Sequence, residues 1–525
     1  MTKLEKLKSN EASKGFVALP FFMIFIVLCV IFSFCPLLLD DYEFLSYNCQ
    51  SIAEAINYAL CYGNGRFLGN LGAILLAPHN AIAAVFKAFT VSLLCILLPK
   101  IFNATKKTTY LLSCLLILAV PEKMFAQVHA WNCGNVNYIL PIIITIFCYL
   151  IIKTKDDGCL ITAVKCLSIF ILGFCGQLFI EHNTLVNLLI SACLFLFFAT
   201  KRKIYGNKKC IISFFWSAAT AVGTVAMLLI PKYFIGERTR DMSKYRNFGI
   251  GSFDELCNTI IDNSAEISEH FSGNFFLILM IAVISYCLLK NYSSESKPVS
   301  LLIGFLKAVT LICVSFDLVY CLLLKNLEIG LSMQRVLMLK LKLIICVVCV
   351  LEILTFFISC FLCLKGRLRI ISIIGAMIYI SSITPLLIIN PIGERTSFLS
   401  TVILISLTIY IYSEFVQKKI IIRNFKQRLV LISLILATIY CLFVSFIYIN
   451  GCSKNIDRHI ESEMKRGATV IEIFKIPNNY CHFNELMLEY KYYYKEYGDI
   501  EFKVISFEEW RENRITEGQD ELWQQ

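Results

Sequence analysis

The sequence predicts an all-α polytopic membrane protein with about thirteen transmembrane helices, and three observations support this fold class. Of the 525 residues, 58% are hydrophobic and only 17% are charged. The mean hydropathy of +0.70 lies outside the range of soluble proteins. Apolar runs long enough to cross a bilayer, or nearly so, occur at 16–39, 71–98, 108–121, 138–152, 159–180, 184–199, 210–231, 275–290, 299–324, 341–364, 370–389, 399–416 and 429–449.

Lysine and arginine predict the orientation of these spans, because both stay preferentially on the cytoplasmic side of a membrane. Placing the polar and basic tail 1–15 in the cytoplasm also leaves the basic segments 201–203, 365–369 and 418–428 inside. Thirteen spans then carry the C-terminus to the outside. The net charge of +11 is therefore mainly a topology signal. We expect no nucleic-acid partner, because no basic and aromatic soluble surface is apparent.

The same pattern favours a bacterial inner (plasma) membrane. The Asn-x-Ser/Thr triplets at Asn103 and Asn291 both fall in inward loops, so no outward glycosylation acceptor is left. The N-terminal apolar run is too long for the core of a signal peptide and is typical of a retained anchor. We expect a multi-pass protein with a cytoplasmic N-terminus and an extracytoplasmic C-terminus.

The chain divides into three parts by composition. A cytoplasmic tail at 1–15 precedes a multi-span membrane domain at 16–449, and a small extracytoplasmic α/β appendage follows at 450–525. Periodicity in this appendage predicts a strand, a helix and a second strand, at 470–476, 484–497 and 500–507. The membrane domain is expected to place five loops outside, at 40–70, 122–137, 232–274, 325–340 and 390–398.

Asp40 and Asp41 follow directly after the first apolar run. Carboxylates lose solvation next to hydrocarbon, so an acidic pair at this depth usually marks an ion path, a metal site or a catalytic base. We treat both as candidate catalytic residues. Asp41 is favoured as the base, because it lies one residue farther from the hydrocarbon and should ionise more readily. The alternative is a solvated loop start that ends the helix.

Polar and aromatic side chains also gather in the first two outward loops. Residues 52–60 predict an amphipathic helix on the outer leaflet, because apolar side chains recur there at helical spacing. Trp131, Asn135 and Asn137 combine an aromatic ring with amides. This combination suits a sugar, because aromatic faces stack on pyranose rings and amides bond to hydroxyl groups. A place in the interfacial aromatic belt explains Trp131 equally well.

Glu181 and His182 interrupt an otherwise continuous apolar stretch. A tight turn between two helices would explain three polar residues here, yet Gly, Ser or Pro would serve a turn as well. Glu and His must be hydrated or paired near lipid, which favours a functional cavity.

The pentapeptide Ile-Gly-Glu-Arg-Thr occurs twice, at 235–239 and 392–396, each time after a proline and just outside an apolar run. Arg238 and Arg395 would lie at the depth of a polyprenyl phosphate headgroup, and arginine offers phosphate two parallel hydrogen bonds. The alternative is that both arginines anchor the helix ends by snorkelling.

Lys87, Asp317 and Glu352 fall inside predicted spans. Charged groups at this depth are costly, so they imply mutual pairing or a water-filled cavity. A carrier or flippase of lipid-linked sugars would use them on a path through the membrane.

Five short motifs resemble the bacterial membrane family DUF6056, which is similar to GtrII-like and other GT-C-type glycosyltransferases. They are Asp-Asp-Tyr-x-Phe at 40–44, Gly-Arg-Phe at 65–67, Trp131, Gly-Asn-x-Asn-Tyr-x-x-Pro at 134–141 and Glu-His-Asn at 181–183. Where relatives carry Pro-Gly-Asn before an arginine, this chain has Pro231-Lys-Tyr-Phe and then Arg238. The resemblance implies a GT-C-like fold, an acidic base in the first outward loop and a polyprenyl-phosphate sugar as donor.

The implied activity is inverting transfer of a sugar to a cell-surface glycan or lipid on the outer side of the bilayer. Asp40 or Asp41 would accept the proton of the acceptor hydroxyl, and Arg238 and Arg395 would offset the charge of the leaving phosphate. Arg66, in the second motif, would contribute to substrate binding. No cofactor is required, although a divalent metal could bind the aspartate pair. A surface-polysaccharide polymerase or ligase, working through outward arginines and histidines without an acidic base, is a further alternative.

Overall fold

The computed structural model describes most of the chain. The described residues are 21–61, 65–104, 106–154, 158–228, 247–248, 252–292, 296–321, 335–390, 392–417, 425–481, 484–493, 497 and 500–516. A helix at Phe21–Ser33 opens this part of the chain. The helices and strands that follow it up to the middle of the chain are α2 (Asp40–Ser46), α3 (Ile52–Cys61), α4 (Phe67–Leu76), α5 (Asn80–Ile101), α6 (Lys107–Leu118), α7 (Glu122–Phe125), η1 (Ala126–Ala130), α8 (Asn132–Gly134), η2 (Asn135–Ile139), α9 (Leu140–Lys153), α10 (Cys159–Cys175), α11 (Glu181–Thr200), α12 (Arg202–Tyr205), α13 (Asn207–Leu228) and β1 (Asn247–Phe248).

The second half continues as a helical bundle and ends in a small mixed unit. Its elements are α14 (Phe253–Ser272), α15 (Phe275–Lys290), α16 (Lys297–Val319), α18 (Arg335–Cys363), α19 (Arg367–Ile383), η6 (Thr384–Leu387), β2 (Ile389–Asn390), η7 (Glu394–Ser397), α20 (Phe398–Gln417), α21 (Phe425–Lys465), β3 (Val470–Phe474), α22 (Asn484–Tyr493), β4 (Glu501–Ile505) and α23 (Phe507–Thr516).

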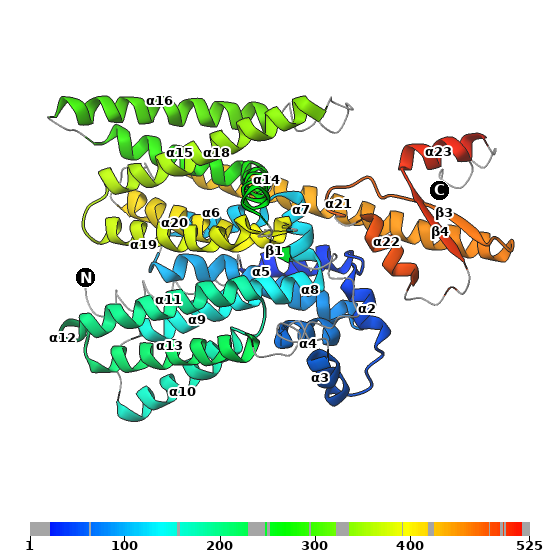
Figure 1. The fold of residues 1–525 in the computed structure, drawn as a ribbon, viewed down its shortest axis with the longest axis horizontal. Helices are drawn as coiled ribbons and strands as arrows, with labels where there is room; N and C mark the ends of the chain where they lie inside the picture. The colour runs from blue at the N-terminus through cyan, green and yellow to red at the C-terminus, as the bar shows by residue number, and fades with distance from the viewer. Residues whose placement is uncertain are drawn as a thin grey trace.

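The long helices lie side by side along the long axis of the molecule (Figure 1), which confirms an α-helical, multi-pass membrane architecture. Within the described residues, nine helices are long and apolar enough to cross a membrane, or eleven if each of two bent pairs counts as one span. The expected number was about thirteen. The expected span at 159–180 corresponds to the shorter helix α10, and the expected span at 16–39 is described from Phe21 onward, as the helix Phe21–Ser33. The short run at 138–152 gains length from residues before it and becomes part of Asn132–Lys153.

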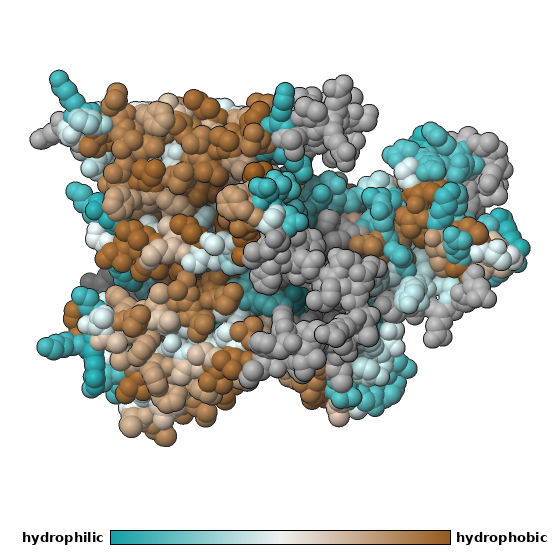
Figure 2. Space-filling view, viewed as in Figure 1, coloured by the Kyte–Doolittle hydropathy of each residue, from teal (hydrophilic) through white to brown (hydrophobic). Residues whose placement is uncertain are grey.

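Apolar side chains cover the outside of this bundle. Figure 2 shows a broad hydrophobic surface over the long helices, with hydrophilic side chains at both ends. Leu160 on α10 and Leu301 on α16 are each 79% exposed. Large exposed apolar side chains in such number are tolerated where lipid replaces water. This hydrophobic surface therefore marks the part of the molecule that lies in the bilayer.

The segment from Glu122 to Ile139 folds back into the bundle, although a loop was expected at 122–137. It bends by 91° from α6 to the helix Glu122–Ala130, and two π-helical turns, η1 and η2, flank the short helix α8. The close approach of Gly134 to Gln127 in this segment requires a glycine, because a Cβ at Gly134 would lie 1.8 Å from the Gln127 carbonyl oxygen. His129 and Asn135 are fully buried. The polar side chains between Gln127 and Tyr138 therefore lie inside the protein.

The C-terminal part forms a parallel pair of strands with helices beside it. β3 and β4 pair in parallel from Val470 opposite Glu501 to Phe474 opposite Ile505, and α22 supplies the crossover that a parallel pair requires. The strands and α22 lie close to where the alternation predicted them. α22 also packs against α2, which joins this unit to the helix that carries the aspartate pair.

Candidate functional site

The aspartate pair opens α2, directly after a strained residue. Leu39 has a φ of 41°, in the left-handed region that costs a non-glycine residue about 1–3 kcal/mol. Asp40, Asp41 and Glu43 all lie in the first turn of α2, where the helix dipole favours negative charge. Backbone strain beside an acidic pair is the kind of local cost that functional sites retain.

The two aspartates have different surroundings. The Asp41 carboxylate is 1% exposed and accepts hydrogen bonds from the backbone N–H groups of Leu38 and Cys133, both at 3.3 Å. Burial raises the pKa of Asp41 to about 7, although the charge of Lys87 works in the opposite direction. Burial therefore works against the expected easy ionisation of Asp41, because α2 turns this side chain into the protein.

Asp40 remains partly exposed and faces positive charge. Its pKa is raised by burial and by Glu43, and it is lowered by the guanidinium groups of Arg395 and Arg66. The Cys133 thiol lies 3.9 Å from its carboxylate. Of the two aspartates, Asp40 is the partly exposed one and is influenced by two arginines, so it is the carboxylate that can accept a proton from an incoming group.

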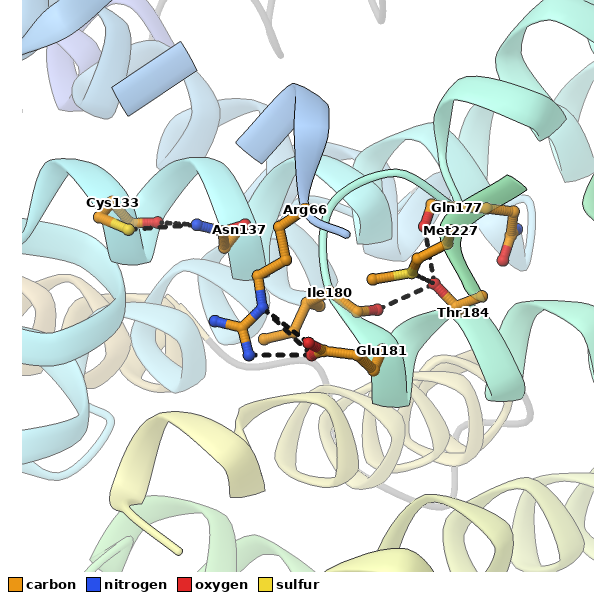
Figure 3. Close-up of polar contacts among 8 residues, drawn as sticks. All are labelled: Arg66, Cys133, Asn137, Gln177, Ile180, Glu181, Thr184 and Met227. Atoms are coloured by element: carbon orange, nitrogen blue, oxygen red, sulfur yellow. Dashed lines mark hydrogen bonds and ion pairs between the residues drawn. The ribbon is translucent and has the colours of Figure 1, made fainter. Parts of the chain in front are cut away.

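Arg66 forms a bidentate ion pair with Glu181 (Figure 3). The guanidinium Nε and one terminal nitrogen donate to the carboxylate at 3.0 and 2.9 Å. Arg66 directly precedes α4, Glu181 is the first residue of α11, and both side chains are about a quarter exposed. Two residues from separate sequence motifs therefore meet next to Asp40.

Arg395 lies over the ring of Trp131, with its guanidinium carbon 5.4 Å from the ring centroid. Its backbone N–H and its guanidinium both donate to the Gln127 side-chain oxygen at 3.4 Å. Trp131 is only 5% exposed. In this arrangement, a sugar can stack on the ring only if Arg395 moves.

Glu394 collects several polar partners next to Arg395. Gln127 donates a hydrogen bond to it, and the Lys123 ammonium lies 3.8 Å away. The His270 ring nitrogen Nε2 is 3.9 Å from the same carboxylate, while Nδ1 lies 3.1 Å from the Ser397 hydroxyl. The second Ile-Gly-Glu-Arg-Thr loop thus joins α14 to the buried segment at 122–139.

The other predicted residues, Asn135, Asn137 and His182, are buried and contact other parts of the protein. Asn137 donates to the Cys133 carbonyl oxygen at 2.9 Å, and Asn135 accepts from the Thr90 hydroxyl at 2.8 Å. Both amides are buried, at 2% and 0% exposure, so the expected contact with sugar hydroxyls is not open to them in this arrangement. The His182 ring packs against Tyr138, with 5.9 Å between centroids.

Arg238 and the first Ile-Gly-Glu-Arg-Thr copy lie outside the described residues. Just after that copy, β1 pairs antiparallel with β2, which places Asn247 opposite Asn390. β2 directly precedes the second copy. The chain segments that flank the two repeats therefore meet in space.

Sequence reasoning missed Gln127 and Cys133 as neighbours of the charged groups, and it did not connect Lys87 with Asp41. Lys87 is 3% exposed, and it donates to the Ala130 carbonyl oxygen at 2.7 Å. Its position inside an apolar span signalled a buried partner, but the partner itself depends on the fold of the segment at 122–139.

Among the residues described, no group of three or more His, Cys, Asp or Glu side chains is arranged to hold a metal ion. The divalent metal considered for the aspartate pair therefore stays a prediction. In comparisons with known proteins, no family model, curated protein or solved structure matches this chain significantly.

Proposed function

We propose that this protein is a membrane glycosyltransferase of the GT-C type, moving a sugar from a polyprenyl-phosphate donor to a cell-surface glycan or lipid. One observation supports the proposal most directly: Asp40 stays partly exposed, and the positive charges of Arg66 and Arg395 both lower its pKa. A base for the acceptor and cations for a leaving phosphate are the two requirements of this reaction.

In the proposed step, the acceptor hydroxyl gives its proton to the Asp40 carboxylate. Its oxygen attacks the anomeric carbon from the face opposite the phosphate, and the bond between that carbon and the phosphate oxygen breaks. The electron pair leaves with the polyprenyl phosphate, and the configuration at the sugar inverts. Arg395 offsets the charge that develops on the phosphate, while Arg238 lies outside the described residues and keeps its predicted role as a proposal.

Asp40 replaces Asp41 as the preferred base in this proposal. Both Asp41 oxygens already accept backbone N–H groups, and Asp41 is only 1% exposed, so an incoming hydroxyl reaches it less easily than it reaches Asp40. Asp41 instead fixes α2 against Cys133, which sets the position of its neighbour.

The flippase alternative expects Lys87, Asp317 and Glu352 to share one path. Lys87 lies on α5 beside Asp41 and Ala130, whereas Asp317 and Glu352 interact with each other between α16 and α18. The structure therefore gives these three residues no common neighbourhood within the described chain, and the transferase is the better supported of the two.

The test is turnover by the purified full-length protein given polyprenyl-phosphate hexoses and surface-glycan acceptors. We expect Asp40→Asn to lower the rate by about a hundredfold to ten-thousandfold, the usual contribution of a general base, with donor binding retained. Glu54→Gln removes an exposed carboxylate from the neighbouring helix α3 that does not act on either aspartate, and it serves as the matched control, with a rate near that of the wild type. Full turnover in the Asp40→Asn/Asp41→Asn double variant would exclude the proposed mechanism and favour the flippase.

A further inference from the structure

Asp317 and Glu352 lie apart from the site described above, in the contact between α16 and α18. Asp317 is 1% exposed and Glu352 is 3% exposed. Their carboxyl groups interact with each other, yet none of the four oxygens makes a well-formed hydrogen bond to another described group. Two acidic side chains are thus enclosed together, close enough to interact but without a well-formed hydrogen bond.

A third polar group points to the same place from a different helix. Ser272 ends α14, is 0% exposed and has a hydroxyl that lies next to Asp317. This hydroxyl also lacks a well-formed hydrogen bond to any described group. Buried polar groups without partners are rare in native proteins. Their convergence here indicates that a small positively charged species completes the arrangement.

The charge at this position must be compensated. No basic side chain among the described residues acts on either carboxyl group. Two ionised carboxylates side by side in an apolar interior repel each other and lose their hydration, so neighbouring acids in such surroundings share one proton. Ca²⁺ takes about six to eight oxygen ligands and Mg²⁺ prefers an octahedral set of about six, whereas two carboxyl groups with one hydroxyl supply fewer than that.

We propose that Asp317 and Glu352 form a proton-binding site, in which one exchangeable proton bridges the two carboxyl groups and the Ser272 hydroxyl completes the hydrogen bonding. The site goes beyond the proposed transfer reaction, because none of its residues belongs to the group around Asp40. The bridging proton joins α16 to α18, and its loss would place two negative charges in the contact between these helices.

Other titratable groups face this site from the neighbouring helices. The Cys313 thiol on α16 and the Cys349 thiol on α18 both interact with the acid pair. The titratable groups on the other packed helices have different neighbours: Tyr379 on α19 lies beside Cys349, Glu269 on α14 pairs with Lys342 at 3.4 Å, and Cys287 on α15 lies near Lys290. The thiols and the phenol are neutral near pH 7, and Glu269 already has a cation of its own. The acid pair is therefore the group expected to exchange a proton near neutral pH.

The experiment uses dicyclohexylcarbodiimide, an apolar reagent that adds to protonated carboxyl groups, on the full-length protein in detergent or liposomes. Mass spectrometry of the peptide that contains Glu352 measures the labelled fraction. We expect labelling to be high in acid, to fall as the pH rises, and to be the same with sodium or potassium chloride. Asp317→Asn removes the second carboxyl group, so half-labelling of Glu352 should need about one pH unit more acid.

Ser272→Ala should move the midpoint of labelling, whereas Ser372→Ala should leave it unchanged. Ser372 is the matched control, because it is a buried hydroxyl on α19 that lies next to Cys360 of α18, away from the acid pair. Labelling that does not change with pH in the wild type would overturn the proposal without any variant. Protection by sodium at constant pH would overturn it as well, because the site would then hold a metal cation.

Discussion

The guanidinium of Arg66 and the carboxylate of Glu181, 115 residues apart in the chain, lie in one bidentate ion pair with an N–O distance of 2.9 Å. The pair connects the start of α4 to the start of α11 (Figure 3). It holds one guanidinium of the Asp40 neighbourhood in a fixed position, because a bidentate pair restricts both distance and orientation.

We expect Arg66→Gln and Glu181→Gln each to lower the free energy of unfolding by about 1 kcal/mol, since the pair is only partly buried. The double variant should cost less than the sum of the two, and the difference measures the coupling. Chemical denaturation of the purified protein in detergent provides the three values. Strict additivity would show that the two side chains do not stabilise each other.

Asp41 should make stability depend on pH. Its folded pKa is raised to about 7, compared with about 3.9 for an unfolded aspartate. The folded state therefore favours the protonated carboxyl group. This contribution is fully present below pH 4 and is lost as the pH rises toward 7. Asn cannot titrate, so Asp41→Asn should remove this part of the pH dependence.

The measurement compares unfolding free energies of the wild type and Asp41→Asn between pH 5 and pH 8. Asparagine retains one acceptor oxygen for the two N–H groups, so we expect the variant to be less stable by about 1 kcal/mol at pH 5. The deficit should shrink or reverse at pH 8. A constant difference at both pH values would contradict a titrating Asp41, and Glu43→Gln on the same helix controls for the loss of a carboxylate.

Arg395 should influence both the donor and the base. The guanidinium of Arg395 lowers the pKa of Asp40, so Arg395→Gln should move the rising part of the pH–rate profile to higher pH. Arg395→Lys keeps the charge and loses only the bidentate geometry, so its pH–rate profile should stay closer to that of the wild type. Donor saturation should weaken more in Arg395→Ala than in Arg395→Lys. Equal donor saturation in the wild type and both variants would exclude a phosphate role for this residue.

Two lysine–carboxylate pairs in the C-terminal unit differ mainly in burial. Lys491 lies 2.8 Å from Asp457 with 4% and 31% exposed side chains, and Lys475 lies 2.7 Å from Glu485 with 51% and 63%. We expect Lys491→Met to lower the unfolding free energy by about 2 kcal/mol. Lys475→Met should change it by less than about 0.5 kcal/mol.

Limited proteolysis of the C-terminal unit gives an independent measure of the same difference. Lys491→Met should be cleaved faster than the wild type, and Lys475→Met should be cleaved at the wild-type rate. If both variants behaved alike, burial would not decide the strength of these pairs.

The C-terminal unit and α2 should lie on the same side of the membrane. α22 packs against α2, and both lie beyond the end of the bundle opposite to α12, which carries Arg202 and Lys203 (Figure 1). Basic residues favour the cytoplasmic side, so a reporter fused after Gln525 of the full chain should report an extracytoplasmic location. A cytoplasmic signal would reverse the predicted orientation and place Asp40 inside.

The sequence by itself determined the class of this protein and the position of most of its long helices. Apolar runs of bilayer length can be satisfied only by helices, because lipid offers no hydrogen bonds to the backbone. The strands β3 and β4 were also visible, since the alternation of apolar residues depends on local geometry alone. The exact number of spans could not be predicted, because within the described residues α10 is shorter than a full span and two helix pairs, α6 with Glu122–Ala130 and α14 with α15, are bent.

Only the tertiary structure decided which polar residues meet. Trp131 and Asn135 were expected in an outward loop, but π-helical turns and the close approach at Gly134 turn this segment into the bundle. The difference between Asp40 and Asp41 has the same origin. Adjacent residues on a helix point about 100° apart, so the surroundings of each carboxylate depend on what packs against α2. Lys87 and the Cys133 backbone N–H act on Asp41, whereas two arginines from distant segments act on Asp40.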